Sequence, residues 1–416
     1  MAGYETTETK NVEFVDFISR AAFDMFTAVM YGESPQTTNS KAALEKDIEF
    51  VQASQKAFDI TGALMTNPLE KVFGSNLYQQ FVVNMDATFN FANQKTKSYA
   101  ERATQEQQQK QQQSLKLVQE DDTPVHGDAT SKCPVTQLKN AIPTSFVNPS
   151  FVERLVHRGE LSNDEISELG APLLMAGVDT TAYVMSWLYL NLASNPLAQE
   201  KLAAELKSVL KGADVTTVEQ MEALPYLKAC IRESHRLTPT APIAAKKFLQ
   251  DIDVVVDNGD TTAYSYRAKA GQRISLNLRG IPMEDRYVEH PHQFMPERFL
   301  PEAIAARKGT PSEVVDHPSF ADPFGRGKRR CLGASVAQAE IFILAARMIQ
   351  DWDITLANPT SKMDWKPKQM LMLKADPYPA MKLVARTWSE RSIVRLEEKD
   401  DCTDRFIFKQ NMSIKY

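Results

Sequence analysis

The stretch PFGRGKRRCLGASVAQAE, residues 323–340, decides the fold. It places one cysteine, Cys331, after a loop rich in glycine and basic residues and before a run of small and apolar residues that predicts a helix. The N-terminus of a helix carries partial positive charge and unpaired N–H groups, which stabilise a thiolate and can hydrogen-bond a coordinated sulfur. An isolated cysteine is more often a buried structural residue, but this loop favours a ligand for iron.

The residues around this cysteine fit a flat, carboxylate-bearing ligand. Glycines let the backbone approach a macrocycle closely, and an arginine fork can pair with a carboxylate. The residues expected in these roles are Gly325, Gly327, Gly333 and Arg329.

A second motif, LLMAGVDTTAYVMSWLYL at 173–190, interrupts an apolar helix with a glycine and three polar residues. Gly177 removes a side chain, and threonine hydroxyls can turn into a helical groove, so a small ligand could lie against the backbone there. Taken alone, the motif is equally compatible with a tolerated polar patch.

Two further motifs carry charge. Glu233 and Arg236 in IRESHRL are spaced i, i+3 for an ion pair, and FMPERF at 294–299 supplies Arg298. Lys228 and Arg232, at i, i+4 on the same predicted helix, form a small basic face. In isolation both sets would be ordinary solvated surface charges of little energetic weight.

Together these motifs resemble the cytochrome P450 family. The haem-binding signature of that family is matched at every fixed position, by Phe324, Gly327, Arg329, Cys331 and Gly333. The resemblance implies a mainly α fold with small β-sheets, a haem b cofactor, and Cys331 as the axial thiolate ligand of its iron. It also implies that Arg329 holds a haem propionate.

The resemblance assigns roles to the other motifs as well. Thr180 would stabilise the iron-bound peroxide and deliver protons, with Asp179 in the relay, while Ala176 and Gly177 would line the oxygen and substrate pocket. Glu233, Arg236 and Arg298 would form a buried charge triad that braces the haem loop.

Several stretches are similar to the mitochondrial-type branch of the family, among them LKACIRE, LSNDEISELGAPLLMAGVDTT and HPSFADPFGRGKRRCLG. Members of that branch dock an acidic ferredoxin on a basic pair, which corresponds to Lys228 and Arg232 here. The resemblance therefore implies a ferredoxin-type or flavoprotein electron donor and a hydrophobic substrate such as a sterol or other lipid. It also implies the mitochondrial inner membrane, or alternatively the endoplasmic reticulum membrane.

The chain departs from the family pattern in places. The resemblance begins near the family's E helix, so an N-terminally incomplete fold is expected, and no WxxxR motif for the haem propionates occurs. Lys246 stands where the family usually has a propionate-binding arginine, and a lysine cannot reproduce a bidentate contact. Asp322 precedes Pro323 where relatives usually have an apolar residue.

Composition limits the function classes. The 416 residues, 43% hydrophobic and 24% charged, suit a sizeable globular core, and the net charge of −5 argues against a nucleic-acid binder. Four scattered cysteines without a CxxC spacing indicate neither a zinc site nor a disulfide framework. The first residues match neither a signal nor a transit peptide, and no run of about 18 apolar residues predicts a transmembrane helix.

Periodicity along the chain predicts mostly helix. Residues 11–31 form an amphipathic helix closed by Gly32, and Ser162 with Glu165 forms a capping box before a long helix to about Ser194. Pro196 begins the next helix, and 248–278 predicts short strands. The Gln-rich stretch at about 103–140 is expected to be a mobile surface loop.

We therefore expect a single domain over 1–388, with a C-terminal tail at 389–416 of unassigned role. The expected function is that of a monomeric haem-thiolate monooxygenase, with peripheral membrane contact and no nucleic-acid partner. The alternative is a truncated, non-catalytic product that binds haem weakly or not at all.

Overall fold

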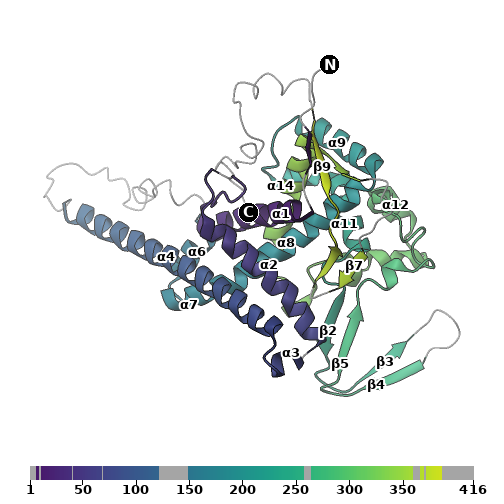
Figure 1. Cartoon of the computed structure of the whole chain (residues 1–416), viewed down its shortest axis with the longest axis horizontal. Helices are drawn as coiled ribbons and strands as arrows, with labels where there is room; N and C mark the ends of the chain where they lie inside the picture. Colours follow the sequence, from purple (N-terminus) through teal and green to yellow (C-terminus); the bar gives the residue numbers. More distant parts are fainter. Residues whose placement is uncertain are drawn as a thin grey trace, which may run out of the picture. The chain divides into compact units, whose positions relative to one another are not determined.

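The computed structural model describes residues 6–8, 11–39, 41–67, 69–120, 149–256, 264–358, 366–369 and 372–386. Helices dominate these residues and small antiparallel sheets accompany them (Figure 1), so the predicted fold class is confirmed. The described residues fall into two compact units. One lies within residues 16–182 and the other comprises residues up to Val15 and from Tyr183 onward.

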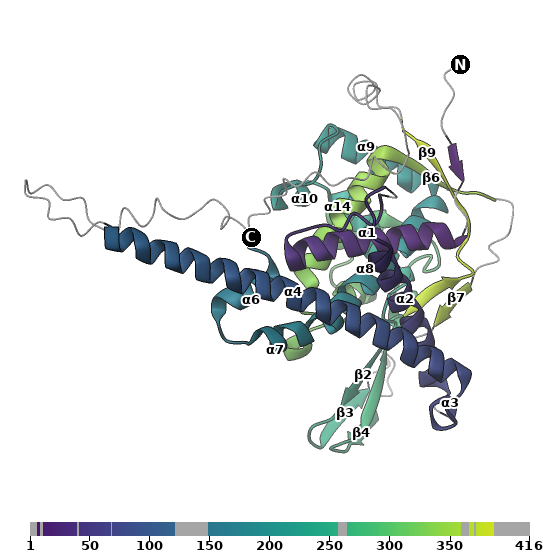
Figure 2. The same ribbon diagram turned by 60° about the vertical axis from the view of Figure 1, so that its left-hand side comes forward.

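The unit within 16–182 is helical. Its elements are α1 (Asn11–Tyr31, from Asp16), α2 (Glu45–Thr66), α3 (Leu69–Val72), α4 (Asn76–Glu120), α6 (Phe151–Arg158), α7 (Asn163–Glu168) and the first half of α8 (Gly170–Ala193). The long helix α4 packs against α2, α6 and α7 (Figure 2). Aromatic contacts join the helices, with Phe23 of α1 and Phe91 of α4 centred 5.1 and 4.9 Å from Phe50 of α2.

Local signals set the ends of these helices as predicted. Gly32, which follows α1, has a φ of 78°, a left-handed conformation that glycine adopts without strain. At the start of α7 the Ser162 side chain accepts from Glu165 N at 3.3 Å, and Ser162 N donates to the Glu165 carboxylate at 2.8 Å. The predicted capping box is therefore confirmed.

The loop expected over the Gln-rich stretch is wrong for residues 103–120, because α4 continues to Glu120. Glutamine, lysine, glutamate and arginine lose little side-chain freedom in a helix, so a Gln-rich stretch is a good local helix former. Low complexity indicates that the stretch cannot bury much apolar surface. It does not indicate whether the backbone is helical. The remainder of the predicted loop, 121–140, lies outside the described residues.

The second unit combines helices with all of the described strands. Its helices are the remainder of α8, α9 (Pro196–Leu210), α10 (Val218–Glu222), α11 (Pro225–Leu237), α12 (Pro301–Ala306), α13 (Pro318–Ala321), α14 (Ala334–Asp351) and the short 3-10 helices η2 (Ile281–Met283), η3 (Pro296–Phe299), η4 (Pro311–Asp316) and η5 (Gly327–Arg329). The second half of α8 is at its centre. Trp187 Nε1 donates to the Leu373 carbonyl at 2.8 Å and Tyr189 Oη donates to the Leu344 carbonyl at 3.1 Å.

The strands form four small antiparallel sheets. β1 (Thr6–Glu8), β9 (Met381–Ala385) and β6 (Trp352–Leu356) pair in that order, and the two-stranded sheets are β2 (Ile243–Lys247) with β5 (Arg273–Asn277), β3 (Ile252–Val256) with β4 (Tyr264–Ala268), and β7 (Lys366–Gln369) with β8 (Leu373–Asp376). β3, β4 and β5 lie within the predicted 248–278. Within the described part of the chain, no helix is both long and apolar enough to cross a bilayer.

Candidate haem and oxygen-activation site

The loop that carries Cys331 is closed by its own backbone. Cys331 N donates to the Phe324 carbonyl at 2.9 Å, and Arg330 N donates to the Gly327 carbonyl at 3.1 Å. This path requires positive φ at Gly325 (71°) and Gly327 (72°), which explains the two glycines. Cys331 is exposed, three residues before α14, with Gly333 at the N-cap position of that helix.

Asp322, which departs from the usual family pattern, has a clear place in this loop. Its carboxylate accepts from Phe324 N at 3.0 Å and lies 3.8 Å from Arg330 Nε. The aspartate therefore supports the first turn of the loop by a local side-chain to backbone hydrogen bond, a contact that an apolar residue cannot make.

The loop fits a flat prosthetic group. No heavy atom lies within 4 Å of the position that a Cβ would take at Gly325, Gly327 or Gly333, so this side of the loop is open. Arg329 is exposed and, among the described residues, makes no ion pair that would compete for its guanidinium. A thiol, open glycines and a free arginine are the features that a thiolate-bound, propionate-bearing macrocycle needs.

The second motif lies on the first half of α8, in the other unit, and is described separately. Thr180 donates its hydroxyl to the Ala176 carbonyl at 2.6 Å, one turn back along the helix. Ala176 is exposed. A Cβ placed on Gly177 would lie 2.4 Å from the ring of Phe26 in α1, so the glycine permits close packing of α1 on α8. The absence of a side chain at Gly177 is therefore explained by its contact with Phe26. The expected role of Gly177 in lining a substrate pocket is not needed to explain it.

Asp179 is buried and hydrogen-bonded to a neighbouring helix. It is 1% exposed, and Ser54 of α2 donates its hydroxyl to Asp179 Oδ2 at 2.6 Å. Burial raises the pKa of Asp179 to about 7, the Ser54 hydrogen bond opposes that rise, and the negative charge of Asp59 adds to it. A carboxyl with a pKa near neutrality can both hold and release a proton at physiological pH.

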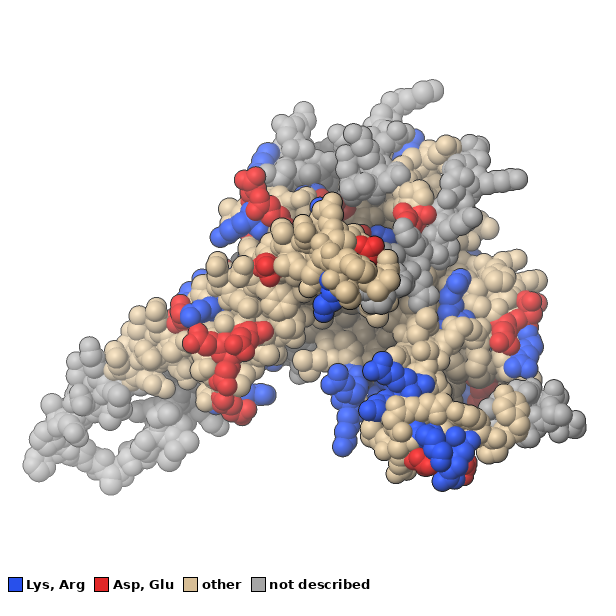
Figure 3. All heavy atoms as spheres, turned by 60° about the horizontal axis from the view of Figure 1, so that its bottom comes forward, with Lys and Arg blue, Asp and Glu red and all other residues tan. Residues whose placement is uncertain are grey.

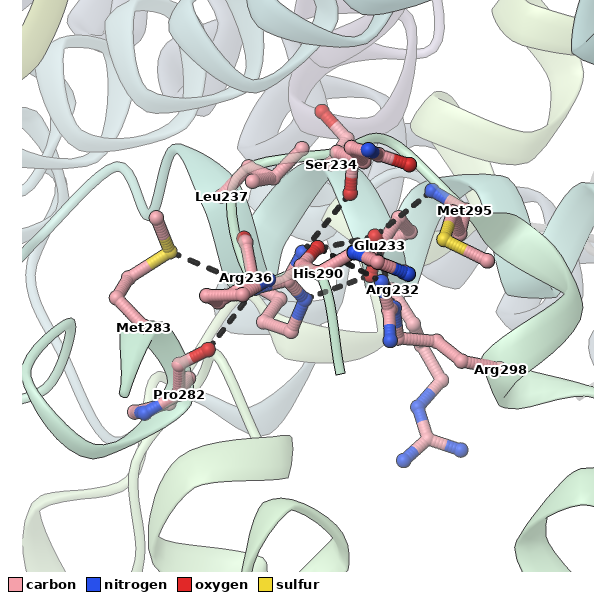
Figure 4. A network of polar contacts seen from close by, with 12 residues as sticks. Arg232, Glu233, Ser234, Arg236, Leu237, Pro282, Met283, His290, Met295 and Arg298 are labelled. Carbon is pink, nitrogen blue, oxygen red and sulfur yellow. Dashed lines mark hydrogen bonds and ion pairs between the residues drawn. The ribbon is translucent and has the colours of Figure 1, made fainter. Parts of the chain in front are cut away.

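The predicted charge triad is present and buried (Figure 4). Glu233 is fully buried, and its two carboxylate oxygens accept from Arg236 Nε and Nη2, both at 2.8 Å. Arg298 Nε donates to Glu233 Oε1 at 3.0 Å, and Met295 N donates to the same oxygen at 2.9 Å. The residues come from α11, from η3 and from the turn before η3, and the structure brings them together at one carboxylate.

The two arginines also hold loop backbone. Arg236 Nη1 donates to the carbonyls of Pro282 and Pro291 at 2.9 and 2.7 Å. Arg298 Nη1 donates to the Glu289 carbonyl at 3.0 Å. One carboxylate thereby orients two guanidinium groups that fix the chain between η2 and η3.

Of the predicted docking pair, Lys228 and Arg232, the arginine already has an acidic partner. Arg232 lies 3.1 Å from Asp316 and its guanidinium is 4.3 Å from the centre of the Phe299 ring. Asp316 also accepts from Arg307 Nη2 at 2.7 Å. Lys228 is partly exposed and makes no ion pair within the described residues.

Lys246 lies on β2 and is exposed, paired in register with Ile274 of β5. Lys and Arg side chains gather on the face of Figure 3 that brings these strands forward. β2 and β5 contribute the exposed Lys246, Lys247 and Arg273 to the basic residues of this part of the chain. Lys246 therefore stays a proposed propionate ligand only.

Three residues important to these sites were missed by sequence reasoning: Ser54, Phe26 and Asp316. Each lies in a segment without a motif, and Ser54 is 125 positions away from Asp179. Only the glycine in the α8 motif offered a signal, since a glycine inside a helix often marks a close approach.

Comparison with known proteins agrees with this geometry. The family model described as Cytochrome P450 matches residues 3–380, and the chain belongs to that family. Its members are haem proteins with an axial cysteine thiolate.

The chain is similar to several curated members of the family. It is 30% identical over 223 residues to the rat mitochondrial 1,25-dihydroxyvitamin D(3) 24-hydroxylase, covering 54% of this chain and 38% of that protein. It is 30% identical over 227 residues to the human mitochondrial sterol 26-hydroxylase, covering 55% and 40%. It is 29% identical over 228 residues to a ferruginol synthase of Salvia pomifera, covering 54% and 47%. In each alignment the chain spans less than half of the relative's length.

The triad gives a stability prediction. Glu233→Gln leaves Arg236 and Arg298 buried without a countercharge, and we expect it to lower the free energy of unfolding by about 3–5 kcal/mol. Urea denaturation followed by circular dichroism measures this loss. Glu33→Gln, which breaks the exposed pair of Glu33 with Arg102, is the control and should cost less than about 1 kcal/mol. Equal losses in the two variants would contradict the proposed weight of the triad.

Asp179 gives a pH prediction. Its folded-state pKa of about 7 lies above the value of 3.8 for an unperturbed carboxyl, so the unfolded state releases its proton first as pH rises. Wild-type stability should therefore fall, relative to Asp179→Asn, between about pH 4 and about pH 7, by about 4 kcal/mol. Urea denaturation across this range measures the difference. Asp164→Asn, at an exposed carboxyl, is the control, and a constant gap for Asp179→Asn would contradict burial of a protonated carboxyl.

Proposed function

We propose that this protein is a haem-thiolate monooxygenase that inserts one oxygen atom from O₂ into a hydrophobic substrate. The observation that carries the proposal is the Cys331 loop. It combines an exposed thiol, two glycines of positive φ and an Arg329 that makes no ion pair with the described residues, in a chain that belongs to the cytochrome P450 family.

We propose that different residues of the loop bind different groups of haem b. Cys331 would supply the thiolate ligand to the iron, and Arg329 would pair with a propionate, with Lys246 as a second candidate for such a contact. Phe324, whose carbonyl accepts from Cys331 N, keeps the loop closed behind the sulfur. Bound haem supplies the activation of O₂, for which electron donation from the thiolate favours O–O cleavage.

Protons are handled by the residues of α8. Thr180 has its hydroxyl proton engaged with the Ala176 carbonyl, which leaves the lone pairs of Oγ1 free to accept a hydrogen bond. Asp179, with a pKa of about 7, can store the proton that passes to that site.

The names of two relatives support the proposed substrate class and location. These relatives carry names of mitochondrial enzymes that hydroxylate vitamin D and a sterol. We infer a sterol or related lipid substrate, a ferredoxin-type or flavoprotein electron donor, and the mitochondrial inner membrane. Lys228 and Arg232 are the proposed contact points for an acidic ferredoxin, with Lys228 the freer charge.

The haem proposal is tested by spectroscopy. The 416-residue chain is expressed with haem supplied, reduced and exposed to carbon monoxide, and the Soret band is recorded. We expect a strongly red-shifted band, because a thiolate ligand donates electron density to the iron.

Cys331→Ala should abolish that band, whereas Cys230→Ala, at a fully buried cysteine, should retain it. Absence of haem uptake, or a band at the ordinary position, would instead support the alternative of a non-catalytic product.

Ferredoxin docking gives a second test. Lys228→Ala should weaken association with an acidic ferredoxin about two- to fivefold at low salt, and less as salt rises, because an exposed charge acts mainly through screened attraction. Titration of the haem-loaded chain with ferredoxin measures the affinity. Lys211→Ala, at an exposed lysine that ends α9, is the control. The same weakening in both variants would argue against docking at α11.

A further inference from the structure

The carboxyl of Asp179 depends on one hydrogen bond from another helix. Ser54 is fully buried on α2, and its hydroxyl donates to Asp179 Oδ2 at 2.6 Å. The other oxygen, Oδ1, is buried and accepts no hydrogen bond from the described residues. The two carboxyl oxygens are therefore not equivalent.

Among the described residues of this helical unit, no cation is paired with Asp179. Lys56 of α2 is exposed. Several charged residues on the neighbouring helices have other partners. They are Asp16 with Arg20 on α1, Asp24 of α1 with Thr37 and Thr38, and Asp47 of α2 with Lys95 of α4. The charge on α2 that acts on Asp179 is Asp59, which is negative. Among the described residues, the Ser54 hydroxyl is thus the one group that donates a hydrogen bond to this carboxyl.

The helix that carries Asp179, α8, is closely packed on two other helices of this unit. A Cβ at Gly177 would lie 2.4 Å from the Phe26 ring, and a Cβ at Gly170 would lie 2.1 Å from Thr96 Oγ1 and 2.8 Å from the Ala92 carbonyl. α8 is therefore closely packed against α1 and α4 at two points within the same unit. Asp179 follows Gly177 by two residues, and close packing there limits movement of this part of the helix.

We propose that Ser54 is a positioning residue for proton delivery, which holds the Asp179 carboxyl by Oδ2 and leaves Oδ1 as the atom that takes up and releases the proton. This inference rests on the proposed function and names a residue for that same site. Ser54 acts through Asp179, to which its hydroxyl donates. The arrangement makes α2 part of the proton pathway.

The direct test is a titration of Asp179 in the haem-free chain. Infrared spectroscopy follows the C=O band of the protonated carboxyl with pH, and Asp179→Asn identifies the band by removing it. Ser54→Ala should raise the midpoint by about one pH unit or more, since the lost hydrogen bond favours the ionised form. Asp59→Asn should move the midpoint in the opposite direction, because a like charge is removed.

Three further variants test the hydroxyl itself. Ser54→Cys, nearly isosteric but a weak donor, should raise the midpoint as Ser54→Ala does, and it carries the test where the alanine variant fails to fold. Ser54→Thr keeps the hydroxyl and should restore the wild-type midpoint. Ser19→Ala is the matched control, because Ser19 is equally buried on α1 but bonds Gln55 rather than Asp179.

In the haem-loaded chain the same variants are compared by the fraction of consumed O₂ that appears in product. Ser54→Ala and Ser54→Cys should lower this fraction and shift its pH profile with the infrared midpoint, whereas Ser19→Ala should change neither. An unchanged midpoint in both Ser54 variants, or a shift that Ser19→Ala reproduces, would overturn the inference. Failure to form a thiolate-haem band would overturn the proposed function alone, because the infrared titration needs no haem.

Discussion

The carboxylate of Glu233 is the charge on which the larger unit depends. It is fully buried, yet it accepts four hydrogen bonds, three from guanidinium nitrogens and one from Met295 N. Burying a carboxylate costs several kcal/mol unless it is paired and fully hydrogen-bonded. The pairing here uses Arg236 on the same helix and Arg298 from a segment more than 60 positions away.

The consequence of that pairing is geometric. Each arginine spends its remaining N–H groups on backbone carbonyls between η2 and η3, so the irregular chain in this region is fixed without a sheet or helix of its own. Arg232, next to Glu233, also connects α11 to other segments through an ion pair. It contacts Asp316, which in turn binds Arg307, and thus joins α11 to η4 and to the segment after α12.

Sequence patterns predict structure best where the signal is local. The Cys331 loop, the α8 motif, the Ser162 capping box and the Pro196 helix start are each set by neighbours within a few positions, and residue type alone restricts the backbone there. The triad was found because both halves carry a recognisable pattern.

Contacts between segments without a pattern were not found. Ser54 is one serine in a long helix, and nothing in its neighbourhood distinguishes it from a solvated position. The Gln-rich part of α4 shows the reverse error, since low complexity was taken for lack of structure although helix propensity favoured a helix. β1 was missed because three residues are too few to show an alternating pattern.

The α8 motif contains two features that each cost stability, a glycine inside the helix and a buried carboxyl. Close packing on α1 demands a glycine at 177, and a glycine inside a helix costs about 1 kcal/mol relative to alanine. Burial of Asp179 without a cation costs more, and it is this cost that brings the carboxyl to a pKa of about 7. A lysine or arginine in place of Ser54 would stabilise the carboxylate and remove its capacity to store a proton near neutrality. A neutral donor keeps the carboxyl in place while leaving its two protonation states close in free energy, which is the property that a proton relay needs.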